Sequence, residues 1–326
     1  MKIIRNLALA TIFIIGLVYT TGFFINSTIP EKEDKEFHKE FNNNYAIYAV
    51  SLPENLEFAG EKVPLEFIDI RESLDREILV NTYWQSQTML FLKRSNKFFP
   101  IIEPILKKNN IPDDFKYLAV AESGLQNVVS PAGARGYWQF LNSTGKDYGL
   151  EINNEVDERY SIEKSTEAAC KYLQESYKKY KNWTLVAASY NVGMRGLDKQ
   201  LVRQKESNYY NLLLNNETAR YLFRILAIKT ILSQPKEFGF HYRAKDLYYP
   251  IRYNNITVDT SITDWADFAK THNTNYKILK LLNPWLRDVK LTNSSGKKYQ
   301  IKIPKENGRM FILPDSVLTD SLKSNQ

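Results

Sequence analysis

The segment Lys116–Leu125, KYLAVAESGL, has the pattern of an apolar helix that carries a single carboxylate close to its end. Three apolar residues stand seven, four and three positions before Glu122: Phe115, Leu118 and Ala119. These spacings belong to one face of a helix, so Glu122 shares the apolar stripe that would face a core. This segment therefore predicts a buried helix with an ionisable group on its inner face.

The residues around this helix predict where it begins and ends. Pro112 suits the first turn, and Asp113 and Asp114 would follow where the helix dipole favours acids. Gly124 suits the C-terminal end. Apolar surroundings and the negative end of the dipole both disfavour a charged carboxylate, so we predict a raised pKa for Glu122, as a general acid needs. From this segment alone, the alternative is a helix-end glutamate that bonds to an arginine or to solvent.

A glycine-rich segment follows this helix. In Ser130–Phe140, SPAGARGYWQF, two glycines would let a polymer approach the backbone, and Gln139 offers both a donor and an acceptor. Tyr137 and Trp138 are candidates for stacking on sugar rings, with a place in the core expected for one of them. Alone, this segment favours a structural role.

Two later segments also bring polar residues to helices. Leu185–Gly193, LVAASYNVG, places Tyr190 and Asn191 at a helix end. The third segment, residues 215–232, NNETARYLFRILAIKTIL, places three polar residues on one helix: Glu217, Thr218 and Tyr221. Each of these segments, taken alone, is also more consistent with a structural role.

The composition is that of a folded protein, since 43% of the 326 residues are hydrophobic and 25% are charged. The net charge of +7 suits an acidic partner, but we see no dense Lys/Arg block of the kind that marks a nucleic-acid arm, so we expect no nucleic-acid partner. Cys170, the only cysteine, lies in a helical run and is expected to be a small core residue. The histidines match no metal-ligand spacing and there is no phosphate loop, so we predict no metal and no other cofactor.

The N-terminus has the features of an export signal. Lys2 and Arg5 precede the uncharged apolar run Leu7–Ile25. This run approaches membrane-spanning length and no clean Ala-x-Ala site follows it, which favours an uncleaved anchor with its basic end in the cytoplasm. A cleaved signal peptide is the alternative. Either way, we expect the rest of the chain in the periplasm or cell envelope.

The chain divides by composition into six parts. Apolar spacing is helical over the central part, which predicts one all-α domain. The predicted boundaries are 1–26 for the signal or anchor, 27–75 for a polar tether with a short strand around Tyr45–Leu52, 76–235 for the helical domain, 236–254 for a linker, 255–305 for a small second domain and 306–326 for a polar tail.

The sequence of the small second domain predicts the order strand, helix, helix, strand. Its first helix has Ser261 or Thr263 as the expected N-cap, and its second helix is stopped before Pro284. Its last strand, in KKYQIKIP, alternates in hydrophobicity and ends at Pro304. The predicted fold class is therefore mainly α, with a helical domain followed by a small βααβ domain.

The four segments described above, in this order, together resemble the catalytic domain of the lytic transglycosylases that cleave peptidoglycan. That domain has a lysozyme-like fold. AESG is similar to the family's Glu-Ser motif, GARGYWQF to its Gly-x-x-Gly-x-x-Gln segment, ASYNVG to its Ala-Tyr-Asn-x-Gly segment, and ETARYLFRI to its Tyr-bearing segment. The resemblance covers about residues 85–235. Ser189 departs from the usual Ala, and Trp138 resembles the membrane-bound type D branch. LKLLNPWL resembles part of a LysM module, whose usual Gly-Asp-Thr start is replaced by VDTSITDW.

The resemblance implies a role for each candidate site residue. Glu122 would protonate the bond between N-acetylmuramic acid and N-acetylglucosamine, and then act as base while the C6 hydroxyl closes on C1 to a 1,6-anhydro sugar. Ser123 would bond Glu122 or the substrate's N-acetyl group. The remaining candidates would hold the sugar or orient Glu122: Gln139, Tyr190, Asn191 and Tyr221. Glycan strands of peptidoglycan are the implied partner, together with the membrane through the N-terminal segment.

Two other functions remain open at this point. A goose-type lysozyme-like hydrolase would need a second carboxylate to activate water, for which the candidates are Asp147, Glu151, Asp157 and Glu158. A non-catalytic anchor protein would bind peptidoglycan through the LysM-like module without releasing fragments. The presence of Glu122 with its polar companions makes the anchor protein the least favoured of the three.

Overall fold

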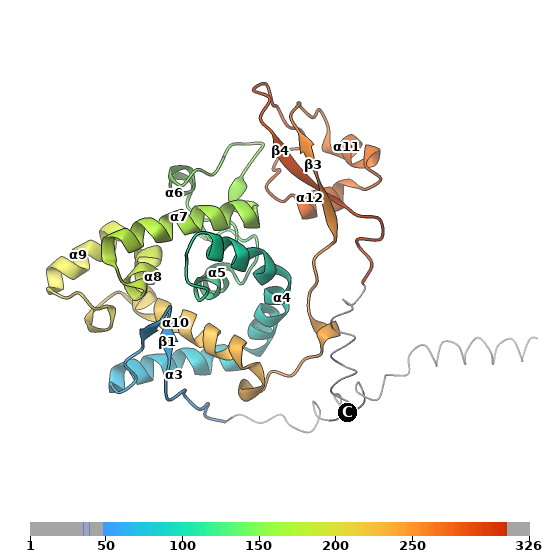
Figure 1. Ribbon diagram of the computed structural model, residues 1–326. Coiled ribbons are helices and arrows are strands. Elements are labelled where there is room, and N and C mark those ends of the chain that lie inside the picture. The colour runs from blue at the N-terminus through green and yellow to red at the C-terminus, as the bar shows by residue number, and fades with distance from the viewer. Residues whose placement is uncertain (1–34, 36–38, 40–47, 312–326) are drawn as a thin grey trace, which may run out of the picture. The chain divides into compact units, whose positions relative to one another are not determined.

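The computed structural model describes residues 35, 39 and 48–311, and it consists mainly of α-helices (Figure 1). The domains described below all lie within residues 50–311. The predicted anchor at residues 7–25 lies outside the described residues. Among the residues that are described, no helix has both the length and the apolar character needed to cross a membrane.

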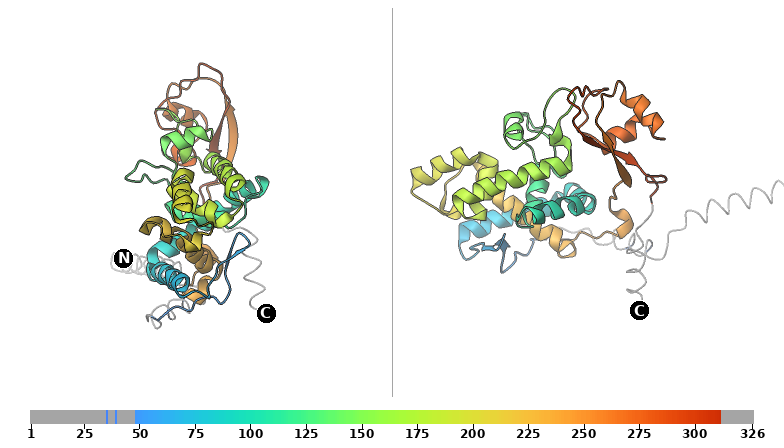
Figure 2. Two further views of the ribbon diagram at one scale, coloured as in Figure 1. Left: turned by 90° about the vertical axis from the view of Figure 1, so that its left-hand side faces the viewer. Right: turned by 45° about the horizontal axis from the view of Figure 1, so that its top comes forward.

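The helical domain begins with a short antiparallel hairpin and continues through a bundle of helices that pack around α5 (Figures 1 and 2). Its elements are β1 (Glu57–Phe58), β2 (Glu61–Lys62), α3 (Ile68–Tyr83), α4 (Gln85–Lys108), α5 (Phe115–Ser123), α6 (Asn142–Asp147), η1 (Glu158–Tyr160), α7 (Ile162–Tyr180), α8 (Trp183–Val192), α9 (Met194–Gln204), η2 (Tyr209–Asn211) and α10 (Asn216–Ser233). The one-turn helices η3 (Pro235–Phe238) and η4 (Ala244–Asp246) lead out of it.

Helix α5 lies at the centre of the core, as its apolar stripe predicts. Phe115, Leu118 and Ala119 are fully buried, and α5 packs against α4 and α10. Gly124 ends the helix with φ of 59°, a left-handed conformation that glycine adopts at no steric cost. The predicted helix, its buried face and its C-terminal end are all confirmed.

The start of α5 differs from the prediction. The helix begins at Phe115, so Pro112 and Asp113 lie in a preceding turn. The Asp114 carboxylate accepts hydrogen bonds from the Ala59 backbone N–H at 2.7 Å and from Lys229 Nζ at 2.8 Å. These two hydrogen bonds replace the expected interaction of Asp114 with the helix dipole. Asp114 therefore connects α10 and the hairpin to the start of α5.

The packed region begins earlier than the predicted boundary at residue 76. Phe58 and Leu74 are fully buried and Val63 is 1% exposed, so part of the stretch assigned to the tether lies in the core. Residues 48–52, the described part of the expected strand, contain no strand, and the hairpin lies at residues 57–62 instead. Composition missed Phe58 and Val63 because these apolar residues are isolated and have no periodicity, whereas the apolar spacing is helical from Ile70 onward.

The second domain has the predicted βααβ order: β3 (Tyr253–Val258), α11 (Trp265–Thr271), α12 (Tyr276–Leu282) and β4 (Tyr299–Pro304). The two strands pair antiparallel, from Tyr253 opposite Pro304 to Val258 opposite Tyr299. Figure 2 shows the short helices beside this strand pair. The predicted stop before Pro284 and the strand end at Pro304 are confirmed.

The expected N-cap of α11 is wrong. Asp264 caps the helix, because its carboxylate accepts from the backbone N–H groups of Ala266 and Asp267. Ser261 instead accepts a bond from the Asn293 backbone N–H at 2.9 Å, so it joins two loops of the domain. Thr263 lies one residue before the capping position, which is occupied by Asp264, a stronger hydrogen-bond acceptor.

A loop of the helical domain, residues 151–163, packs against the second domain. Val156 and Tyr160 belong to the same hydrophobic cluster as Trp265 and Leu286. Backbone hydrogen bonds join Asp157 N–H to the Trp285 carbonyl at 2.9 Å and Arg287 N–H to the Glu155 carbonyl at 2.7 Å. Ion pairs of Glu151 with Lys297 and of Glu163 with Lys302 flank this contact. The two domains therefore share one continuous apolar and hydrogen-bonded contact.

Candidate active site

Glu122 and Tyr221 meet at the centre of the helical domain. Glu122 is the penultimate residue of α5 and is half-buried, whereas Tyr221 comes from α10 and is 2% exposed. The Tyr221 hydroxyl donates a hydrogen bond to Glu122 Oε1. This bond fixes the orientation of the carboxylate while part of Glu122 stays open to solvent.

The surroundings of Glu122 favour its neutral form. Burial raises the pKa of Glu122 to about 7, and the negative charge of Glu217 adds to the rise. The hydrogen bond from Tyr221 and the positive charge of Arg224 act in the opposite direction on this pKa. The direction agrees with the prediction from the helix pattern, and a carboxyl with this pKa is able to give and take a proton near neutral pH.

Ser123 lies at the end of α5, and its hydroxyl bonds to the backbone, not to Glu122. Its hydroxyl donates to the Tyr137 carbonyl at 2.7 Å and also lies 3.2 Å from the Ala119 carbonyl. The side chain is buried, and a hydroxyl has a single proton to donate. Ser123 therefore joins the end of α5 to the glycine-rich segment and does not donate to Glu122.

Gln139 holds a tight turn in the glycine-rich segment. Its side-chain amide nitrogen donates to the Gly136 carbonyl at 2.8 Å and to the Val128 carbonyl at 3.1 Å, and its own φ is 50°. Among the described residues, no donor contacts its Oε1 oxygen. The amide nitrogen of Gln139 therefore already donates to backbone carbonyls, and its Oε1 oxygen is the group that can accept from a ligand.

The aromatic pair beside Gln139 is buried. Trp138 is fully buried and donates from its ring nitrogen to Thr166 Oγ1 at 2.9 Å, and Tyr137 is 7% exposed. The place in the core expected for one of the two is confirmed, and because the other is buried as well, neither ring is exposed for stacking on a sugar. Their rings form part of the core below the turn.

Tyr190 and Asn191 lie at the end of α8, as predicted. The Tyr190 hydroxyl donates to the Trp138 carbonyl at 2.8 Å, so α8 holds the same turn as Gln139 does. Asn191 Oδ1 accepts from Thr218 Oγ1 at 2.8 Å, which leaves its amide nitrogen without a partner among the described residues. Asn191 therefore presents donors next to the α10 segment that carries Tyr221.

Residues 99–213 match the transglycosylase SLT domain family. Over these residues the chain is similar to a transglycosylase SLT domain. The match includes Glu122, Ser123, Gln139, Tyr190 and Asn191, and Tyr221 lies beyond it in the same folded unit. Residues 254–307 match the soluble lytic transglycosylase C-terminal LysM-like domain family.

Two relatives, each named membrane-bound lytic murein transglycosylase D, come from two strains of Escherichia coli. Each is 28% identical over 244 residues, which is 73% of this chain and 52% of the relative. The chain therefore spans about half the length of the curated relatives that it matches.

Ser189, the departure from the usual alanine, is accommodated inside the helical domain. Its hydroxyl is fully buried, lies 2.7 Å from the Ser176 hydroxyl and donates to the Val186 carbonyl at 2.8 Å. The buried Ser176 hydroxyl on α7 is thus a hydrogen-bond partner for the hydroxyl that Ser189 adds relative to alanine. The departure leaves the end of α8 undisturbed.

Of two charged residues near Glu122, Arg224 was not predicted from sequence, and Glu217 was placed on its helix without this role. Arg224 Nη1 pairs with Glu217 Oε1 at 3.1 Å, and the charges of both act on Glu122. The available signal was their spacing, because Glu217, Tyr221 and Arg224 stand at i, i+4 and i+7 on one helix face. Only the packing of α10 on α5 brings that face to Glu122.

Three of the four carboxylates considered for activating water have other partners. Asp157 forms a buried ion pair with Arg159 at 2.7 Å, and Glu158 accepts from the Glu151 backbone N–H at 2.8 Å. Glu151 itself accepts from the Tyr299 hydroxyl at 3.1 Å. None of the four is among the groups that shift the pKa of Glu122.

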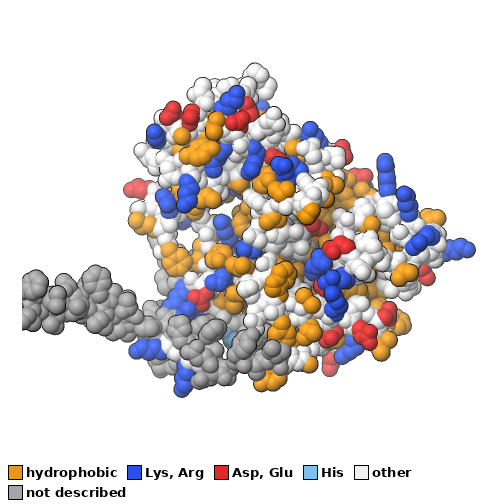
Figure 3. Space-filling view, turned by 180° about the vertical axis from the view of Figure 1, so that it is seen from behind, with side chains coloured by type: hydrophobic (Ala, Val, Ile, Leu, Met, Phe, Trp, Pro, Cys, Tyr) orange, Lys and Arg blue, Asp and Glu red, His pale blue; other side chains and the backbone are white. Residues whose placement is uncertain are grey.

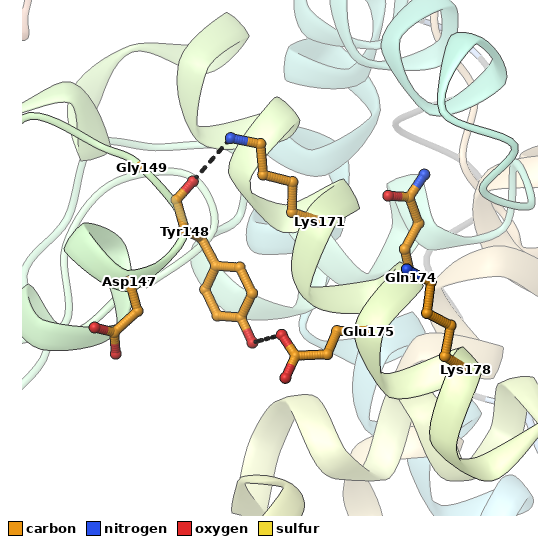
Figure 4. A pocket seen from close by; sticks show the side chains of 7 residues that line it. All are labelled: Asp147, Tyr148, Gly149, Lys171, Gln174, Glu175 and Lys178. Atoms are coloured by element: carbon orange, nitrogen blue, oxygen red, sulfur yellow. Dashed lines mark hydrogen bonds between the residues drawn. The ribbon is translucent and has the colours of Figure 1, made fainter.

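The fourth of these carboxylates, Asp147, lines a polar surface hollow of about 440 Å³ between α6 and α7 (Figure 4). Lys171 donates to the Tyr148 carbonyl there at 3.2 Å, and the Tyr148 hydroxyl donates to Glu175 at 2.8 Å. None of the candidate site residues lines this hollow, so it is separate from the Glu122 site. Within the described residues, no group of three or more His, Cys, Asp or Glu side chains is arranged to hold a metal ion.

Proposed function

We propose that this chain is a peptidoglycan lytic transglycosylase that cleaves the bond between N-acetylmuramic acid and N-acetylglucosamine. The observation that carries the proposal is Glu122, a half-buried carboxyl with a pKa of about 7 held by Tyr221 inside an SLT domain. The relatives named above, both lytic murein transglycosylases, support the same reaction class.

In the first step, protonated Glu122 gives its proton to the glycosidic oxygen. The bond from that oxygen to C1 then breaks, and its electron pair leaves with the N-acetylglucosamine hydroxyl. Positive charge develops on C1 and the ring oxygen of N-acetylmuramic acid. Glu122 becomes a carboxylate at this moment, and the Tyr221 hydroxyl, already bonded to Oε1, stabilises the new negative charge.

In the second step, the Glu122 carboxylate takes the proton of the C6 hydroxyl in the same sugar. The C6 oxygen forms a bond to C1, which gives 1,6-anhydro-N-acetylmuramic acid and restores protonated Glu122. The proton count balances without net addition of water. Because the nucleophile belongs to the same ring, closure gains effective molarity, and one carboxylate serves both steps.

The neighbouring polar groups would hold the sugar in place. Asn191 has donors free to face the substrate, and Gln139 has an acceptor oxygen. Tyr190 and Ser123 fix the turn between them through the backbone carbonyls of Trp138 and Tyr137. We therefore assign binding to the first pair and positioning to the second.

The deciding experiment is mass spectrometry of the fragments released from purified peptidoglycan. Anhydro ends support the proposed reaction. Reducing ends, one water heavier, would instead identify the lysozyme-like hydrolase. Glu122→Gln keeps the shape of the side chain and removes its proton, so we expect no fragments from it. Wild-type release by that variant would refute the assignment of Glu122, and binding without any release by the wild type would identify the anchor protein.

We further propose that the substrate is the glycan of the cell wall and that the protein acts in the periplasm or cell envelope, held by its predicted N-terminal anchor. The net charge of +7 suits an anionic wall polymer. Lys and Arg side chains occur at several separate places on the face in Figure 3. The domain limits of 76–235 and 255–305 also remain proposals, with the helical core extended toward residue 58 by the buried side chains described above.

A further inference from the structure

Glu77 is a buried carboxylate that the proposed mechanism does not use. It lies on α3, is 1% exposed, and accepts bonds from Arg76 Nη1 at 2.5 Å and Arg220 Nε at 2.7 Å. Its other oxygen lies 3.9 Å from Arg224 Nε. A buried carboxylate destabilises a fold unless cations pair with it, and here three arginines do so.

Two of these arginines flank the tyrosine that contacts Glu122. Arg220 precedes Tyr221 by one residue on α10, and Arg224 follows it by three. Helix α3 lies along α10 in the bundle (Figure 1). Glu77 therefore holds α10 from the side of α3, at the turns from which Tyr221 reaches Glu122.

We propose that Glu77 is a positioning residue of the active site, which fixes the rotation of α10 by binding Arg220 and Arg224 and so aims the Tyr221 hydroxyl at Glu122. This inference rests on the proposed function and deepens it. Arg224 links the two carboxylates, because it lies against Glu77 and its charge also acts on Glu122. A merely structural ion pair would stabilise the fold without this link.

The groups around Glu122 give the sign of the effect. Tyr221, Arg224 and Glu217 act on Glu122 from α10, Tyr190 lies near it on α8, and Glu77 lies behind the arginines on α3. Of the groups that lower the pKa of Glu122, the bond from Tyr221 has a larger effect than the charge of Arg224. If loss of Glu77 turns α10 and breaks this bond, the pKa of Glu122 rises, so the activity that remains should extend to higher pH.

The test compares Glu77→Gln with Glu77→Asp and with Arg76→Gln in the full-length chain. For Glu77→Gln we expect kcat on purified peptidoglycan to fall about 10- to 100-fold with little change in KM, as for a misplaced catalytic group. The high-pH limb of the activity profile should move up by at least about half a pH unit, because the bond from Tyr221 to Glu122 is weakened. Glu77→Asp should restore part of both effects, because it keeps the charge.

Arg76→Gln is the matched control, because Arg76 is the half-exposed partner of Glu77 and does not belong to α10. We expect its kcat and pH profile to equal those of the wild type. If Glu77→Gln does not fold, Arg220→Gln provides a second test, since Arg220 is partly exposed. It removes a positive charge, so the high-pH limb should move up while kcat falls.

Direct titration of the Glu122 carboxyl by NMR separates this inference from the proposed function. A higher pKa of Glu122 in Glu77→Gln supports the positioning role even if the wild type releases no anhydro fragments, which would refute the proposed function alone. An unchanged pKa and an unchanged pH profile, with only a lower melting temperature, would show that Glu77 is structural and overturn the inference.

Discussion

Replacing Tyr221 by phenylalanine removes one hydroxyl from beside Glu122 and leaves the ring in place. That hydroxyl is buried and donates to Glu122 Oε1. A hydrogen bond to a charged group contributes about 1.5 to 3 kcal/mol, and about 1.4 kcal/mol corresponds to one pKa unit. Loss of the bond should therefore raise the pKa of Glu122 by about one to two units above its value of about 7.

The same bond matters more as the reaction proceeds. Glu122 loses its proton while the glycosidic bond breaks, so the Tyr221 hydroxyl stabilises the forming carboxylate more than the protonated acid. Losing about 1.5 kcal/mol of that stabilisation lowers kcat about 10-fold. For Tyr221→Phe we thus expect kcat reduced about 10-fold near neutral pH, KM almost unchanged, and the high-pH limb moved up by about one to two units.

The assay is the initial rate of release of soluble fragments from purified peptidoglycan, measured across the pH range by mass spectrometry. Tyr209→Phe is the matched control, because Tyr209 is also buried and its hydroxyl donates to the carbonyls of Thr218 and Ala219. It should lower the melting temperature without moving the pH profile. If the profile of Tyr221→Phe also stays in place, the role given to the Tyr221 bond is wrong.

Three other predictions follow from the packing. Because the pKa of Glu122 is raised from 4.5 to about 7, the folded state keeps a proton that the unfolded chain loses above pH 4.5. The free energy of unfolding should therefore fall by roughly 3 kcal/mol as the pH rises to about 7. In calorimetry, Glu122→Gln should melt higher than the wild type at about pH 8 and nearly equally below about pH 4. Gly136→Ala should lower the free energy of unfolding by about 3 kcal/mol or more, because the φ of Gly136 is 82° and an added Cβ would lie 1.9 Å from the Arg159 carbonyl oxygen. The denaturation midpoint should move to clearly lower denaturant concentration, and equal midpoints would contradict this. Ser123→Ala should cost about 1 to 2 kcal/mol in chemical denaturation through the lost bond to Tyr137, and it should leave the pKa of Glu122 unchanged by NMR.

The glycine-rich segment shows where reading the sequence reached its limit. Its glycines and its Gln139 were recognised, but the direction of each side chain was not. Ser123 and Gln139 both donate to backbone carbonyls within the domain, because a tight turn leaves carbonyl groups that need donors. A polar residue in a motif therefore has two possible partners, the ligand and the turn itself, and the sequence does not choose between them.

The domain boundary shows a different limit. Phe58 and Val63 fill the core, although the stretch around them reads as polar and irregular. Their burial depends on the hairpin folding back on α5 and α10, which no local periodicity encodes. The βααβ order of the second domain was predictable, because each of its elements has its own turn or proline signal.

The sequence by itself determined the α5 helix, its buried face with Glu122, its end at Gly124 and the order of the elements, because helix periodicity and backbone stops act over a few residues. Only the tertiary structure decided what surrounds Glu122. Tyr221 is 99 residues away in the chain, and Glu77 is 143 residues from Arg220. These contacts follow from how α3, α5 and α10 pack, and the desolvation and charge that set the pKa of Glu122 arise from that packing.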